Sequence, residues 1–319
     1  MARVLVTGGS GLIGWPSVQA LLEQSHDVVV YDLKPNYDNL AGLENAVTVV
    51  AGDVTDLPKL LTTMKRHRVD HVLHLAAFIT ESARLDPAGA FRTNTLGTAA
   101  VFDAALARDV RRVVWTSSAT ALAVGEDYDN TPVGEAHPMI SSEPYGASKH
   151  AAEVVADGYR RNLGLDVIGI RPAMVYGVGR LSGGTGLFNQ AVRKMALGQP
   201  TGVLGSHTLH QALYNRDMAE LLVAALFAHT PEHHLFHAPV ERNYDDDELL
   251  TVLRRVCPDA QVHIDPIPEY IPRVPVMDGT RLTRELGFTP RFSLEEGVRE
   301  MVAQFRRQVT DKDAVAAAI

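Results

Sequence analysis

Residues 7–14 read TGGSGLIG, directly after the apolar run RVLVT at residues 3–7 and before a stretch with helical spacing. Glycines at 8, 11 and 14 permit a tight turn and let the backbone approach a pyrophosphate. The N-terminus of the following helix offers free N–H groups and the positive end of its dipole. A structural turn is the alternative, but the strand–turn–helix context predicts a dinucleotide site. The residues expected to contact the dinucleotide are Gly8, Gly11, Leu12 and Ile13.

Short apolar runs alternate with helical stretches through the first half of the chain. Strands are predicted at 3–7, 27–31, 47–50, 71–75, 112–116 and 166–170, and helices at about 12–24, 56–67, 87–108 and 145–163. Pro16 should perturb the first of these helices, because it lacks an N–H and its ring needs space. Nearly all-apolar strands separated by helices are typical of a parallel sheet covered on both faces. The sequence therefore predicts an α/β fold with a doubly wound parallel sheet of the Rossmann type.

Proline and glycine become frequent after residue 171. We expect 1–171 to form a dinucleotide-binding domain, 172–310 to be a smaller mixed α/β region that mainly binds substrate, and 311–319 to be a flexible tail. Within the second region, helices are predicted at about 186–197, 217–228, 245–256 and 293–307. The glycine-rich stretch 177–186 is predicted to be a flexible loop.

Composition excludes several classes of protein. A chain of 319 residues with 46% hydrophobic and 21% charged residues can bury a sizeable core. The net charge of -8 argues against nucleic-acid binding, which needs concentrated Lys and Arg. No apolar run is long enough to predict a membrane span. The single cysteine, Cys257, excludes an internal disulfide, and we expect a cytoplasmic protein.

Two carboxylates follow predicted strands on the side of the dinucleotide. Asp32 lies about twenty residues after the glycines, where it can accept hydrogen bonds from both ribose hydroxyls of NAD and repel the 2′-phosphate of NADP. A turn or cap is its alternative role, and Lys34 nearby weakens the exclusion of NADP. Asp53 could reach the adenine or cap the helix that starts near Leu57.

Tyr145 and Lys149 lie four residues apart in the stretch YGASK. On a helix, both side chains share one face. A free tyrosine titrates at about pH 10. A nearby lysine, together with the positive nicotinamide ring, would lower the pKa of Tyr145 and let the phenolate take a proton near neutrality. The spacing is common by chance, but here it follows a nucleotide cradle.

In these and further stretches the chain resembles the extended short-chain dehydrogenase/reductase family, also called the NAD-dependent epimerase/dehydratase family. The resemblance covers about residues 3–305. The matching stretches are TGGSGLIG (7–14), GDV (52–54), LAA (75–77), NTLGT (94–98), TSSAT (116–120), YGASK (145–149) and RPAMVYG (171–177).

This resemblance implies NAD as the cofactor and a role for each matching residue. Tyr145 would be the acid/base, and Lys149 would bind the nicotinamide ribose and tune Tyr145. Ser118 would hydrogen-bond the reacting oxygen, with Ser117 and Thr120 as rivals. Further residues expected at the cofactor are Val54, Leu75, Ala76, Ala77 and Asn94, the last of which could instead simply start a helix.

Two positions depart from the pattern of family members that act on nucleotide sugars. Met174 stands where these usually carry Asn, and His210 where they usually carry an Arg that contacts the substrate's phosphates. Methionine is a poor hydrogen-bonding partner and histidine is mostly neutral at neutral pH, so a pyrophosphate would lose a charge-assisted contact. We therefore expect a smaller, non-nucleotide substrate. The residues expected to contact it are Thr80, Ser118, Thr120, Met174, Arg180 and His210.

The leading hypothesis is an NAD-dependent oxidoreductase that transfers a hydride between NAD and the secondary alcohol or ketone of a polyol, sugar acid or hydroxy-ketone. One alternative is a nucleotide-sugar 4-epimerase with tightly bound NAD, and another is a catalytically silent dinucleotide-sensing protein. No metal site is expected, because His233, His234 and His237 have no evident carboxylate partner in the sequence.

The resemblance also implies a homodimer through the helices at about 87–108 and 145–163. Small apolar side chains there suit close helix packing, although they could equally pack on the sheet of their own subunit. These side chains are Ala99, Ala100, Ala104, Ala105, Ala151, Ala152 and Val155.

Overall fold

The structure is a computed structural model that describes residues 1–122, 130–139, 141, 143–268, 271 and 273–317. Its centre is a seven-stranded sheet in the order β10-β6-β5-β4-β1-β2-β3, in which every neighbouring pair is parallel. This confirms the predicted doubly wound fold. The strands are β1 (Arg3–Thr7), β2 (Asp27–Asp32), β3 (Val47–Ala51), β4 (His71–His74), β5 (Arg112–Thr116), β6 (Val167–Arg171) and β10 (Leu235–His237).

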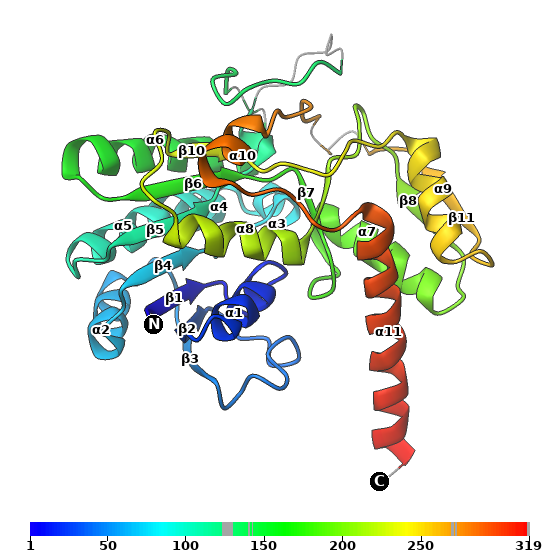
Figure 1. Ribbon diagram of the computed structural model, residues 1–319, viewed down its shortest axis with the longest axis horizontal. Helices are drawn as coiled ribbons and strands as arrows, with labels where there is room; N and C mark the ends of the chain where they lie inside the picture. Colours follow the sequence, from blue (N-terminus) through cyan, green and yellow to red (C-terminus); the bar gives the residue numbers. More distant parts are fainter. Residues whose placement is uncertain (123–129, 140, 142, 269–270, 272, 318–319) are drawn as a thin grey trace.

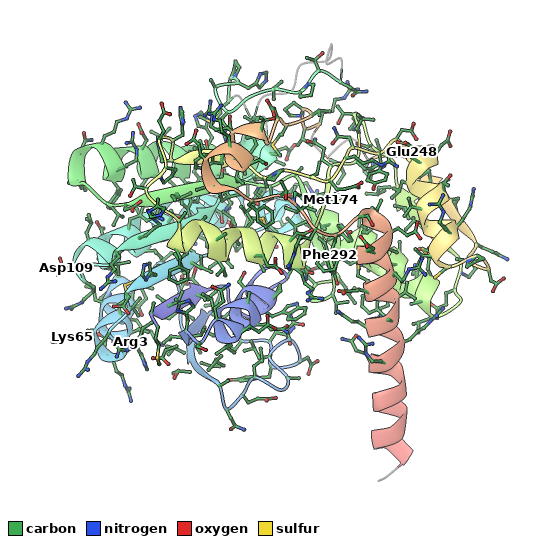
Figure 2. All side chains as sticks on the ribbon, in the orientation of Figure 1. Arg3, Lys65, Asp109, Met174, Glu248 and Phe292 are labelled. Atoms are coloured by element: carbon green, nitrogen blue, oxygen red, sulfur yellow. The ribbon has the colours of Figure 1, made fainter. Side chains whose placement is uncertain are left out.

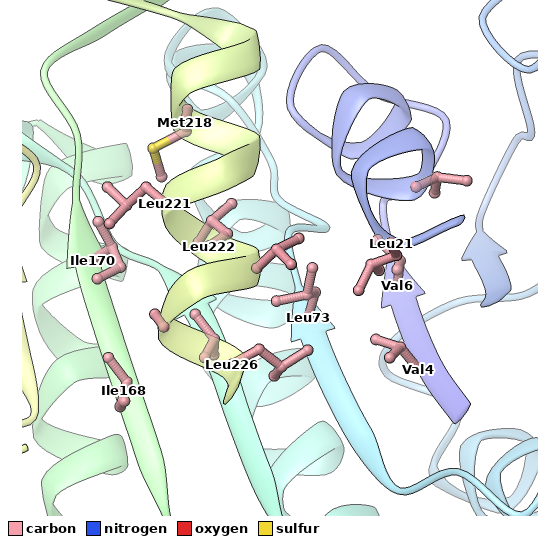
Figure 3. Packing of buried hydrophobic residues seen from close by; sticks show 14 of the residues in the cluster. Val4, Val6, Leu21, Leu73, Ile168, Ile170, Met218, Leu221, Leu222 and Leu226 are labelled. Carbon is pink, nitrogen blue, oxygen red and sulfur yellow. The ribbon is translucent and has the colours of Figure 1, made fainter. Parts of the chain in front are cut away.

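Helices cover both faces of this sheet (Figure 1). One face carries α1 (Gly14–Glu23) and α8 (Asn215–Phe227), and the other carries α2 (Leu57–His67), α5 (Thr98–Leu106) and α6 (Pro144–Leu163). Figure 3 shows α8 lying across the strands, with Leu222 and Leu226 among the buried side chains on that face. Consecutive strand residues enter opposite cores, as the pleat requires, so the all-apolar strands are buried on both sides.

Two predicted helices differ from the structure. The first begins at Gly14 instead of residue 12, so Pro16 lies in the first turn, where backbone N–H groups have no acceptor within the helix, and it does not disturb α1. The second, at 87–108, is divided into α4 (Pro87–Ala90), a π-helical segment η1 (Phe91–Gly97) and α5. The hydroxyl of Thr98 donates to the carbonyl of Asn94 at 2.6 Å beside the widened segment.

A second lobe follows the main sheet and has its own core around α7 (Gly183–Ala196), α9 (Asp246–Val256) and α11 (Leu294–Ala317). It contains the pairs β7–β9 (Met174–Tyr176 with Ala212–Tyr214) and β8–β11 (Thr201–Leu204 with Val262–Asp265). Two short helices complete the fold, α3 (Thr80–Leu85) and α10 (Thr280–Leu286).

The expected boundaries at 171 and 310 can be compared with these elements. Helix α8 and strand β10 come from 172–310 yet pack against or join the main sheet. Helix α11 continues through 311–317, the stretch expected to be a tail, and 318–319 lie outside the described residues. In the part of the chain that the structure describes, we find no helix with the length and apolar character needed to span a membrane.

Candidate active site

A cavity of about 610 Å³ lies at the carboxyl edge of the main sheet and extends to the second lobe. It lies beside the topological switch point between β1 and β4, where the strand order reverses and where doubly wound sheets bind ligands. Every residue expected at the cofactor lines this cavity, with the exception of Asn94. Every residue expected at the substrate lines it too, including Thr80, Thr120 and Met174, and Figure 2 labels Met174 between the two lobes.

The glycine turn after β1 fits a pyrophosphate. Gly8 has a φ of +67°, and a Cβ there would lie 2.7 Å from the backbone nitrogen of Ala76, while a Cβ on Gly14 would overlap the carbonyl of Gly8. These positions therefore require glycine. Helix α1 begins at the cavity with no side-chain cap and no acidic residue in its first turn, which leaves its positive end to a ligand.

Asp32 is held at the end of β2 above this turn. Its Oδ2 accepts hydrogen bonds from the Ser10 hydroxyl at 2.7 Å and the Ser10 N–H at 3.2 Å. Its Oδ1 accepts from the backbone N–H of Lys34 at 3.3 Å. The carboxylate is therefore fixed at the cavity wall, near the glycine turn, as its spacing in the sequence predicts for a ribose ligand.

Asp53 also lines the cavity, but its capping role differs from the predicted alternative. Its Oδ1 accepts from the N–H and hydroxyl of Thr55, at 2.9 and 2.8 Å. The N-cap of α2 is Asp56, which accepts from the N–H of Lys59 at 3.0 Å. Asp53 thus stabilises the turn before the helix.

Asn94 lies behind the cavity wall. Its amide accepts from the N–H of Phe78 at 2.7 Å, and donates to the Phe78 carbonyl and the Ser148 hydroxyl, both at 2.9 Å. Ser148 in turn donates to the carbonyl of Tyr145 at 2.7 Å. Asn94 is fully buried, so its amide ties the turn after β4 to α6 instead of facing a cofactor.

Ser118 and Tyr145 meet inside the cavity. The Ser118 hydroxyl hydrogen-bonds the phenol of Tyr145 and accepts a bond of 2.8 Å from the Thr120 hydroxyl. The rival Ser117 donates its hydroxyl to Glu153. Ser118 is therefore the serine that contacts the phenol, and Thr120 hydrogen-bonds Ser118.

Charges around Tyr145 differ from the sequence-based expectation. Burial raises the pKa of Tyr145, whereas the Ser118 hydrogen bond and the guanidinium of Arg180 lower that pKa. Lys149 lies with its Nζ 6.0 Å from the centre of the Tyr145 ring and donates to the carbonyl of Thr116 at 2.8 Å. Arg180, which the sequence placed at the substrate, is thus also a cation that acts on the phenol.

Lys149 is itself deeply buried. Burial lowers the pKa of Lys149 to about 8, and the negative charge of Glu153 opposes this fall. Glu153 accepts from Arg171 at 2.7 and 2.6 Å, and Arg171 is fully buried. This Ser117–Glu153–Arg171 network joins the ends of β5 and β6 to α6. Sequence analysis missed it, because its members lie far apart in the chain.

Four side chains fix the segment that carries Arg180. Trp15 donates to the carbonyl of Val178 at 2.8 Å, and Asn39 donates to the carbonyl of Gly179 at 2.9 Å. Asn189 donates to the carbonyl of Arg180 at 2.9 Å, and Asn215 reaches Val178 at 3.2 Å. The predicted loop is present at 177–182, where its first residues are fixed by these hydrogen bonds, but residues 183–186 already belong to α7.

His210 is tied to a carboxylate. Its Nε2 lies 2.7 Å from Oδ1 of Asp246, and its backbone exchanges two hydrogen bonds with Tyr244. Arg273 is a further cation at the cavity that sequence analysis missed, because it lies in an irregular stretch without periodicity. Thr185 and Phe188, from α7, line the cavity as well.

Two of the three histidines singled out after α8 do have carboxylate partners, so the expectation of none is wrong for His233 and His234. His233 lies 2.8 Å from Glu285 of α10, and His234 lies 3.3 Å from Asp157 of α6. These carboxylates are remote in sequence and could not be paired by inspection. Glu232, His233 and Glu285 could together approach a cation, but Glu285 already pairs with His233 and Arg284.

Known proteins share this fold and sequence pattern. The model of the NAD dependent epimerase/dehydratase family matches residues 4–235. A UDP-glucose 4-epimerase of Mycolicibacterium smegmatis is 29% identical over 96% of this chain and 99% of that protein. Another UDP-glucose 4-epimerase, from Halalkalibacterium halodurans, is 35% identical over 53% of this chain. The match spans about half (49%) of that protein.

Solved structures give the same picture. A UDP-glucose 4-epimerase from Thermotoga maritima with UDP-glucose has a TM-score of 0.86 and 25% identity, covering 96% of this chain and 99% of that one. An L-threonine dehydrogenase from Clostridium difficile has a TM-score of 0.85 at 19% identity, over 97% and 98% of the two chains, and shares the fold alone.

Proposed function

Because this chain belongs to the NAD-dependent epimerase/dehydratase family, we propose that it is an NAD-dependent oxidoreductase that interconverts a secondary alcohol and a ketone on a small, non-nucleotide substrate. The observation that carries the choice of substrate is the pairing of His210 with Asp246. By the resemblance, a phosphate-binding Arg usually occupies the position of His210. Here a carboxylate lies 2.7 Å from the ring, and a second nearby position carries the apolar Met174.

The chain's own groups supply proton transfer and positioning. Tyr145 takes the hydroxyl proton in oxidation and returns it in reduction, and Ser118 fixes the phenol and the reacting oxygen. Asp32 and the glycine turn would hold the adenosine ribose and the pyrophosphate of the dinucleotide. NAD, when bound, supplies the hydride acceptor.

A diphosphate fits the His210 side of the cavity poorly. Asp246 would repel it, and an imidazole that already pairs with Asp246 replaces a guanidinium. Each lost charged contact is worth about 1.5–3 kcal/mol. Arg273 on the same side of the cavity is the specific observation that favours the second candidate, a nucleotide-sugar 4-epimerase like the relatives from M. smegmatis and T. maritima.

Two measurements separate these functions. Calorimetry of the NAD-loaded protein with UDP and UDP-glucose is expected to show no micromolar binding. A panel of polyols, sugar acids and hydroxy-ketones, followed by absorbance, is expected to show net formation or consumption of NADH. Micromolar binding of UDP-glucose and its isomerisation without net NADH would replace the proposal by the epimerase.

We expect NAD to bind more tightly than NADP. A 2′-phosphate would face the fixed carboxylate of Asp32, and like charges in contact cost on the order of several kcal/mol. The test is titration of both cofactors. Asp32→Asn is the matched variant, since it keeps the shape and should improve NADP binding. Equal or tighter NADP binding by the unmodified protein would contradict the prediction.

We also expect a homodimer through the stretch 87–108, which contains α4, η1 and α5, and through α6. Ala104, Ala105 and Ala152 pack inside their own subunit, so they do not form the interface. Leu96 and Val154, in contrast, are 63% and 61% exposed at η1 and α6. Light scattering at micromolar concentration should give twice the mass of the chain, and Val154→Glu should shift it toward the monomer. A monomeric mass for the unmodified protein would refute the dimer.

A further inference from the structure

Arg180 is a cation that lines the cavity and has no countercharge within ion-pair distance among the described residues. Among the residues that the structure describes, no carboxylate forms an ion pair with Arg180, and its buried Nε has no hydrogen-bond partner. The two most buried arginines differ in this respect: Arg112 pairs with Asp166 at 2.9 Å, and Arg171 pairs with Glu153 at 2.6 Å. A guanidinium removed from water is costly unless it is paired, so a bound anion would supply the partner that the described residues do not.

The fold holds this cation at the reacting end of the cavity. Trp15 and Asn39 fix the two residues before Arg180, and Asn189 holds its own carbonyl. Arg180 lines the same cavity as Tyr145 and is close enough to act on the charge of the phenol. Since Tyr145 must touch the reacting oxygen, an anion bound by Arg180 would lie in the same part of the cavity as the reacting carbon.

The remaining lining fits an anion as well. The only acidic residues among the described residues of the cavity wall are Asp32 and Asp53, both at the dinucleotide end. The substrate end carries the guanidinium groups of Arg180 and Arg273. A compact anionic substrate would therefore meet cations without meeting a carboxylate on the wall, apart from Asp246 behind His210.

We propose that Arg180 binds a substrate carboxylate located one or two carbons from the reacting carbinol, so that the substrate is a 2- or 3-hydroxy acid or a sugar acid. This inference rests on the proposed oxidoreductase function. The planar guanidinium suits a carboxylate, to which it can donate two parallel hydrogen bonds. A nucleotide sugar fits this position poorly, because its diphosphate is attached to the anomeric carbon, across the ring from carbon 4.

The reaction balances with NAD as the only co-reactant. The carbinol loses its hydroxyl proton to Tyr145 and a hydride to NAD, and the products are a keto acid and NADH. The carboxylate itself is not changed. Arg180 therefore acts by binding and orienting the acid.

The activity test compares acids with neutral counterparts. Lactate, glycerate, 3-hydroxybutyrate, galacturonate and gluconate are each assayed beside the methyl ester or the parent sugar or polyol, with NADH absorbance as the readout. We expect at least one acid to be oxidised with kcat/KM at least tenfold above its neutral counterpart. Arg180→Gln should lower kcat/KM for that acid by on the order of a hundredfold and remove the preference. Arg193→Gln is the matched control, because Arg193 is exposed on α7.

A binding test does not depend on turnover. Malonate should bind the NADH-loaded protein in calorimetry, whereas malonamide should not, and Arg180→Gln should abolish malonate binding while its melting temperature and NADH affinity stay unchanged. The inference would be overturned if malonate did not bind the unmodified protein, or if it bound Arg180→Gln with the same affinity. Oxidation of the neutral alcohols with the same kcat/KM as the acids would also overturn the inference, although the proposed oxidoreductase function would then stand. Isomerisation of UDP-glucose without net NADH would instead remove the proposed function itself.

Discussion

Tyr145→Phe is expected to lower turnover by about two to four orders of magnitude, the usual contribution of a positioned acid or base. The variant loses only the phenolic oxygen, which hydrogen-bonds Ser118, and keeps the ring that lines the cavity. NAD binding should therefore change little. The measurement is single-turnover oxidation of the best substrate of the panel, with NAD affinity determined in parallel.

A second tyrosine provides the control for this experiment. Tyr37 is 61% exposed and does not line the cavity, so Tyr37→Phe should keep the full rate. If Tyr145→Phe retained a tenth or more of the activity, a different group would have to carry the proton. Thr120, which donates to Ser118 at 2.8 Å, would be the next residue to test.

The pH dependence of oxidation follows from the same phenol. The proton acceptor must be ionised, so kcat/KM for oxidation should rise with pH through the pKa of Tyr145, and the rate of reduction should fall. Burial raises that pKa, whereas Ser118 and Arg180 lower it. Arg180→Gln should therefore move the rise to higher pH, and a shift to lower pH would show that the phenol does not carry the proton.

The cofactor end of the site could be predicted because its signals are local. Six of the seven strands of the main sheet contain a short, mostly apolar run, and parallel strands bring their carboxyl ends to one edge. Strand β10, with three residues, gave no such signal. Gly8, Asp32, Ser118 and Tyr145 each lie at or just after such an end or on the following helix. Knowing the order of the elements was therefore enough to bring these residues together.

The substrate end could not be predicted in the same way, because tertiary contacts determine it. Strands β7 and β9 have three residues each, and the pairing of Met174 with Ala212 leaves no periodic signal. Asn94 was expected at the cofactor, but it does not line the cavity, and its buried amide contacts Phe78 and Ser148. The segment around Arg180 looked loose, because glycine frequency does not reveal side chains that bind it from elsewhere.

The buried pair of Glu153 and Arg171 gives the second large expected effect. Glu153→Ala should destabilise the protein by about 3–5 kcal/mol, because it leaves the fully buried guanidinium of Arg171 without its partner. Urea unfolding measures the change. Glu153→Leu combined with Arg171→Met should recover most of the loss, since apolar replacements of similar volume remove both charges together. If Glu153→Ala lowered the free energy of unfolding by less than about 1 kcal/mol, the ion pair would not contribute substantially to stability, and the prediction would be wrong.

The double variant also tests whether the Glu153–Arg171 pair sets the charge of Lys149 in the cavity. Glu153 opposes the fall in the pKa of Lys149, which burial has already lowered to about 8. Without Glu153 that pKa should fall further, so that a larger fraction of Lys149 is neutral at neutral pH. A folded double variant should therefore show weaker NAD binding that recovers as the pH is lowered, because acid restores the ammonium. The unmodified protein at the same pH values is the control, and an unchanged pH profile of binding would mean that the network supports the fold without setting the charge of Lys149.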